Sequence, residues 1–186
     1  AKERWQQSWQ EFNSGATMGP AVTAEMAEGL TLLSMVMECK CRIPQAFHFI
    51  KGNHENILNR RGGGDFPFCK FANEGEQVRC FMRDMYGDDV LHVISCFEKE
   101  LPVAAVFPRC LVSHAEPRRA FTRQELIDAR NSSETVFDLT WTENDAAKEG
   151  GVKQMLDTVS GGSEEAVYLA GHRPVQGNYA LRQKGL

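Results

Sequence analysis

The stretch "FIKGNHEN", residues 49–56, places an asparagine and a histidine directly after an apolar run. The run itself, "AFHFI" over residues 46–50, predicts a short buried strand that follows a helical segment, an order typical of an α/β unit. Side chains at strand ends in α/β sheets converge on one rim, where sites are usually built. Asn53 and His54 are therefore the first candidate site residues.

Two further apolar runs end in the same way. The segment "CLVSH" ends at His114, and "EAVYLAGH", residues 165–172, ends at His172. The first of them is preceded by "LPVAAVF", residues 101–107, and the two-residue connection between them predicts a strand hairpin. Three strand ends that each carry a potential ligand are typical of a metal site, although spacing alone leaves a structural role for each histidine open.

The remaining chain reads as helices and connections. Thr122 and Glu125 have the spacing of a capping box at the start of a helix. We expect a mixed α/β fold in a single domain over residues 1–186. The predicted helices cover residues 1–12, 22–39, 75–87, 88–98 and 122–130, and residues 13–20 are expected to form a loop.

Composition narrows the classes of partner and compartment. The chain has 186 residues with 21 basic and 25 acidic side chains, a net charge of −4, which does not favour binding to nucleic acid or to an anionic membrane. No apolar run approaches the roughly 18 residues of a membrane span, and the first residues lack the apolar region of a secretory signal. Six scattered cysteines are typical of reduced thiols, so we expect a cytoplasmic protein.

Four segments, taken together, resemble a known family. They are "GNHE" at 52–55, "CFEKELPVAAVFPRCLVSHAEP" at 96–117, "FDLTWTEND" at 137–145 and "YLAGHRPVQGNY" at 168–179. In this order they resemble motifs of the calcineurin-like metallophosphoesterases, in their serine/threonine protein phosphatase form. The resemblance covers about residues 20–180 and implies a β-sandwich flanked by helices. Each short motif alone is weak, whereas four in the family's order are specific.

The resemblance also implies a reaction and roles for residues. Asn53, His114 and His172 would be metal ligands, and His54 would donate a proton to the leaving oxygen. Two divalent ions (Mn, Fe or Zn) would be the cofactors, and a metal-bound hydroxide would hydrolyse a phosphomonoester of a protein or a small molecule. Glu55 would hold the loop by hydrogen bonding. Dinucleoside polyphosphate hydrolysis on the same fold is an alternative.

The sequence also departs from the family. The motifs Gly-Asp-x-His-Gly and Gly-Asp-x-x-Asp-Arg-Gly, which supply the aspartates, are missing, and aligning the second on residues 13–19 puts Ser14 and Met18 at positions that need an aspartate and an arginine. We therefore expect a domain that is incomplete at both ends relative to the family, with residues 1–20 as an N-terminal helix and loop and a junction near 13–19. Either the sequence is part of a whole enzyme, or the protein is a degenerate, inactive binding module.

Substrate contacts are less specified. Arg60, Arg118 and Arg173 follow the proposed site loops and are candidates for phosphate binding, with solvated surface as the other interpretation. Because the three ligands bring no carboxylate, we expect this exact chain to bind at most one divalent ion and to show no phosphatase activity. Asp138 and Asp145 are the first carboxylates to examine if two ions bind.

Overall fold

The computed structural model describes residues 2–69 and 72–182, and the chain divides into two compact units. The first, here called the helical unit, comprises Ala1–Phe49, Asn56–Arg60 and Pro67–Glu98. The second, the mixed unit, comprises Ile50–Glu55, Arg61–Phe66 and Lys99–Leu186. That both belong to the single domain expected from the sequence stays a prediction.

The helical unit is built on α1 (Lys2–Asn13), α2 (Pro20–Arg42) and most of α3 (Glu74–Glu100). The N-cap of α2 is Gly19, and its first residue is a proline, whose fixed φ angle suits a helix start. At Gly87 the backbone of α3 leaves the helical region, with φ 82° and ψ 170°. The two successive helical stretches expected over residues 75–98 are therefore confirmed.

Apolar side chains from all these segments form the core of the helical unit. α1 and α2 pack against each other, and residues from α2 and α3 enclose one residue of the 56–60 segment. The buried members are Val22, Ile57, Phe81, Met82, Leu91 and Ile94.

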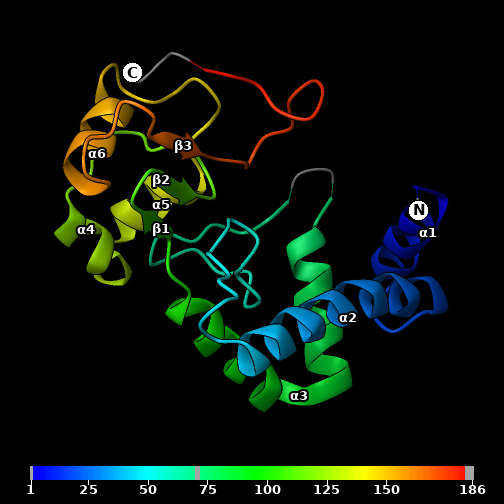
Figure 1. Ribbon diagram of the computed structural model, residues 1–186. Coiled ribbons are helices and arrows are strands. Elements are labelled where there is room, and N and C mark those ends of the chain that lie inside the picture. Colours follow the sequence, from blue (N-terminus) through cyan, green and yellow to red (C-terminus); the bar gives the residue numbers. More distant parts are fainter. Residues whose placement is uncertain (1, 70–71, 183–186) are drawn as a thin grey trace. The chain divides into compact units, whose positions relative to one another are not determined.

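The mixed unit contains one three-stranded sheet in the order β1-β2-β3 (Figure 1). β1 (Ala104–Phe107) and β2 (Cys110–Ser113) form the predicted antiparallel hairpin, with Phe107 paired to Cys110. β3 (Val167–Leu169) pairs with β2 in parallel. The strands are shorter than the apolar runs that predicted them, but they lie within those runs.

Four short helical segments lie between β2 and β3. They are α4 (Arg123–Ile127), the 3₁₀ turn η1 (Ala129–Asn131), α5 (Ser133–Thr140) and α6 (Gly151–Val159). Thr122 and Glu125 form the predicted capping box at α4. The helix expected over residues 122–130 is too long, because the α-helix ends at Ile127 and the chain continues as a 3₁₀ turn.

The core of the mixed unit is formed by the hairpin and these helices. α5 and α6 bury apolar side chains in one cluster with Leu111 of the hairpin, and the partly buried Leu126 of α4 packs against it, which excludes water from a continuous interior. The buried residues of this core are Val103, Leu111, Phe121, Ala129, Val136, Leu139, Ala147, Val152, Met155, Leu156 and Val159.

The strand expected over residues 46–50 is wrong. The backbone N–H groups of Ala46 and Phe47 both donate to the carbonyl of Ile43, at 2.9 and 3.0 Å, so the run begins as a turn. The following residues, 47–50, belong to no strand. An apolar run becomes a strand only where a neighbouring strand supplies its hydrogen bonds.

The sheet and helices establish a mixed α/β structure for the part of the chain that the structure describes. Within residues 2–69 and 72–182, no helix is both long enough and apolar enough to cross a membrane.

Candidate functional site

Two of the candidate histidines lie at the carboxyl ends of adjacent parallel strands. His114 follows directly after β2, and His172 follows β3 by three residues. The pairing of the two strands extends to this point, because Gly171 N–H donates to the carbonyl of His114 at 2.9 Å. The two imidazole rings lie with their centroids 5.2 Å apart. Carboxyl ends of parallel strands are the usual place for ligand sites in α/β sheets.

The third candidate, Asn53, reaches the same place from a loop. Lys51 N–H donates to the carbonyl of Pro102 at 2.8 Å, which holds the loop beside the start of the hairpin. Asn53 Oδ1 lies 2.8 Å from His114 Nε2, and this nitrogen lies 3.2 Å from His172 Nδ1. The structure therefore brings the three expected ligand side chains together, although only two of them follow a strand.

A buried network holds the loop that carries Asn53. The carboxylate of Glu55 accepts a hydrogen bond from Gly52 N–H at 2.6 Å, which is the loop contact expected for this glutamate. Lys51, only 4% exposed, donates from Nζ to the carbonyl of Glu55 at 2.7 Å and pairs with Asp65 at 3.3 Å. Burial raises the pKa of the Glu55 and Asp65 carboxyls, and the positive charge of Lys51 opposes that rise. Sequence reasoning missed Lys51 and Asp65, since nothing local links them.

Backbone geometry at the site depends on two residues. A Cβ atom at Gly52 would lie 2.7 Å from Glu55 Oε2 and 2.9 Å from His114 Nδ1, so only glycine allows the loop to approach this closely. His172 has φ 66°, the left-handed region that non-glycine residues rarely adopt. Such strain is concentrated at functional sites in proteins.

The surroundings keep the central imidazole neutral. Burial, together with charge repulsion from the neighbouring His172 and His54, lowers the pKa of His114 to about 4. At neutral pH the ring therefore carries a lone pair and no net charge, the form that binds metal ions. One residue before His114, Ser113 Oγ lies 2.6 Å from Tyr168 Oη, and this contact joins β2 to β3.

The three donors fit one metal ion better than two. Bonds from zinc to nitrogen and oxygen are about 2.0–2.2 Å long, which puts neighbouring donor atoms about 3–3.5 Å apart, close to the spacings found here. The set is neutral, and among the described residues no group of three or more histidine, cysteine, aspartate or glutamate side chains is arranged to hold a metal ion. Two adjacent ions need carboxylates to offset their repulsion, so a two-ion site does not fit these residues.

The acidic residues near the site have other contacts. Glu116 accepts a hydrogen bond from the backbone N–H of Asp145 and pairs with Arg182. Asp138 lies in α5 and is buried; burial raises its pKa, against the charges of Arg118 and Arg119.

The other predicted site residues are distributed unevenly. His54 is exposed and close enough to His114 to affect its titration. Arg173 forms two hydrogen bonds with the carboxylate of Glu143, and Arg118 is exposed. Arg60 belongs to the helical unit, where its backbone bonds to the side chain of Asn56.

Comparison with models of known protein families, with curated proteins and with solved structures finds no match to this chain.

Proposed function

We propose that the chain contains the asparagine and histidine metal ligands of a metal-dependent phosphoesterase with the calcineurin-like fold. The observation that carries the proposal is that Asn53 Oδ1 and His172 Nδ1 each lie within hydrogen-bonding distance of His114 Nε2. One amide oxygen and two imidazole nitrogens form a donor set suited to zinc or manganese. Motifs in the order of the protein phosphatases give the second line of support.

The chain's own residues would have distinct tasks. Asn53, His114 and His172 would hold one divalent ion, which when bound supplies charge that polarises a phosphoryl oxygen and water. The Glu55–Gly52 hydrogen bond keeps the loop in the conformation that presents Asn53. His54, exposed next to the cluster, would donate a proton to the leaving oxygen of the ester. The substrate would be a phosphomonoester, on a protein or on a small molecule.

A second candidate is a phosphatase-like binding module without activity. The lack of a carboxylate ligand in the described cluster favours it, since phosphoryl transfer on two ions depends on a bridging aspartate. The two candidates differ in whether aspartates from another part of the protein complete the site. Either way, this exact chain is expected to bind no more than one ion.

Zinc binding tests the proposal directly. The chain is dialysed against Zn²⁺, then against buffer, and the retained metal and the hydrolysis of p-nitrophenyl phosphate are both measured. We expect one ion per chain and no turnover above background. His114→Ala and His172→Ala should each lose the ion, while His92→Ala, an exposed histidine of α3, should keep it.

Two results would contradict the proposal as stated. Two retained ions or clear turnover would mean that carboxylates complete the site, with Asp138 and Asp145 as the first to examine. No retained ion, or equal retention by all variants, would overturn the metal site and leave the binding module.

A further inference from the structure

β1 is an edge strand whose outer side has no partner in the described residues. The sheet order places β2 on one side of it only. In an antiparallel pair every second residue directs its N–H and C=O groups away from the partner strand. Outside the ladder with β2, no backbone hydrogen bond within residues 2–69 and 72–182 involves Ala104–Phe107. These groups can therefore pair with a further strand.

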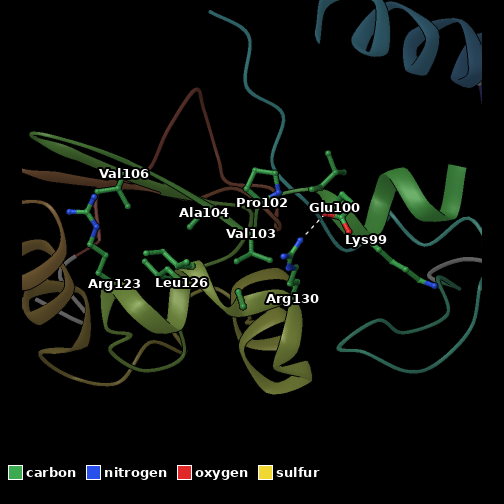
Figure 2. Close-up of a pocket in the computed structure, with 12 residues that line it drawn as sticks. Lys99, Glu100, Pro102, Val103, Ala104, Val106, Arg123, Leu126 and Arg130 are labelled. Atoms are coloured by element: carbon green, nitrogen blue, oxygen red, sulfur yellow. Dashed lines mark hydrogen bonds and ion pairs between the residues drawn. The ribbon is translucent and has the colours of Figure 1, made fainter. Parts of the chain in front are cut away.

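A cavity of about 370 Å³ runs alongside this strand, between β1 and the helical segments that follow the hairpin (Figure 2). All of its lining residues belong to the mixed unit. Its apolar lining comes from both sides: Val103, Ala104 and Val106 from the strand side, and Leu126, Ile127 and Ala129 from α4 and η1. Val106 and Ile127 are 40% and 63% exposed, so apolar surface here is in contact with water.

Charged residues around the cavity are mostly basic. Lys99, Arg123 and Arg130 line it, against a single acidic residue, Glu100. Figure 2 shows Arg123 beside Val106 and, farther along the cavity, Arg130 paired with Glu100 at a distance of 2.9 Å. Three positive charges against one leave a local excess of two in a protein of net charge −4. The site is therefore complementary to an acidic ligand.

The strand also lacks the features that usually block pairing at an edge. Proteins protect such edges with charged side chains, proline or bulges within the strand. The sequence of β1, "AAVF", contains none of these residues, and prolines occur only outside it, at Pro102 and Pro108.

We propose that β1 and this cavity bind an extended acidic peptide, which adds to the sheet as a fourth strand. Main-chain hydrogen bonds to β1 would supply affinity, and alternate apolar side chains of the peptide would enter the cavity over Ala104 and Leu126. Carboxylates flanking them would contact Arg123 and Arg130. This surface shares no residue with the proposed metal site, so the two proposals stand independently.

The test uses the whole chain and a fluorescent synthetic peptide in which valine alternates with glutamate, followed by anisotropy. Binding is expected, and a peptide with lysine in place of glutamate should bind at least tenfold more weakly. Arg123→Glu should weaken binding by about tenfold, because one exposed attraction becomes a repulsion. Lys148→Glu, the same charge change at an exposed position outside the cavity, should have no effect. Glu100→Gln should tighten binding about twofold, since it removes the only acidic lining residue.

The mode of binding has its own test. Methylating alternate backbone nitrogens of the peptide should abolish binding if the peptide joins the sheet edge. Val106→Lys, an exposed change that places a charge on the edge, should do the same while circular dichroism stays unchanged. Equal binding of the glutamate and lysine peptides, or full binding of the methylated one, would overturn the proposal. So would concentration-dependent dimerisation that Val106→Lys abolishes, because the occupant would then be a second copy of the chain.

Discussion

The polar contacts in the core of the helical unit differ in kind from the histidine cluster of the mixed unit. In the helical unit, buried polar groups meet complementary partners: Gln77 donates to Ser8, and the carboxylate of Glu98 accepts from the backbone N–H of Ile57 at 2.8 Å. In the mixed unit, His114 Nε2 lies 3.2 Å from His172 Nδ1, and burial together with repulsion from His172 and His54 lowers the pKa of His114 to about 4.

This difference distinguishes polar groups that hold the fold from the polar groups that we propose to bind a ligand. A hydrogen-bonded partner offsets the desolvation of a buried polar atom, so the contacts in the helical unit stabilise it. The half-buried imidazoles of His114 and His172 repel each other when protonated, so protonation of this pair opposes the folded state. Arrangements that oppose stability are typical of functional sites.

The largest effect is expected from His54, if the site is catalytic. In a protein that joins this chain to the family's aspartate motifs, His54→Ala should lower manganese-dependent hydrolysis of p-nitrophenyl phosphate by about 10²–10⁴-fold while metal content is unchanged, because general-acid help has that size. His92→Ala, in the helical unit, is the control and should keep its rate. A His54→Ala variant as fast as the parent would remove this residue from the mechanism.

Truncating one core side chain in each unit tests whether zinc binding depends on the mixed unit alone. Phe81 in the helical unit and Phe121 in the mixed unit are 2% and 1% exposed. Each change to alanine should lower the free energy of unfolding by about 3–5 kcal/mol, measured by denaturant titration. Zinc retention in conditions where the protein stays folded should fall for Phe121→Ala and persist for Phe81→Ala. Equal loss of zinc in both variants would contradict the comparison.

The helix caps of the two units also differ, and removing them should have smaller effects on stability. In the mixed unit α4 is capped locally by Thr122, whereas in the helical unit Glu11 of α1 accepts hydrogen bonds from Ala21 and Val22 at the start of α2, at 2.8 and 2.9 Å. Thr122→Ala and Glu11→Ala should each cost about 1 kcal/mol in the free energy of unfolding. Thr158→Ala, inside α6, is the control and should change it by less than about 0.5 kcal/mol. An effect of Glu11→Ala no larger than that control would show that α2 does not depend on the distant cap.

The smallest effect concerns the buried carboxyl of Asp138. Because burial raises its pKa in the folded state, its contribution to stability is complete below the unfolded pKa and is lost as the pH rises through the folded pKa. Asp138→Asn should therefore match the parent near pH 3.5 and exceed it at pH 7, by less than about 1 kcal/mol, because the charges of Arg118 and Arg119 offset part of the cost of burial. Thermal melts at both pH values check this. A variant less stable than the parent at pH 7 would show that the charged form has a favourable partner.

The elements that sequence predicted correctly depend on neighbouring residues. Thr122 and Glu125 form a capping box because both lie within one helical turn, and the two-residue connection after Phe107 fixes the hairpin register. Gly87 interrupts α3, at the boundary expected between two helical stretches. The run at 46–50 misled the prediction, because apolar composition does not reveal whether a partner strand is present.

The sequence alone determined which side chains could form a site, since Asn53, His114 and His172 each follow an apolar run. Only the tertiary structure brings these three side chains together. The parallel pairing of β2 with β3 joins residues more than fifty positions apart, and the bond from Lys51 to Pro102 brings in the loop. The buried pair of Lys51 with Asp65 and the Glu11 cap depend on folding in the same way. Local motifs follow from the geometry of one turn or strand end, whereas these contacts follow from the path of the whole chain.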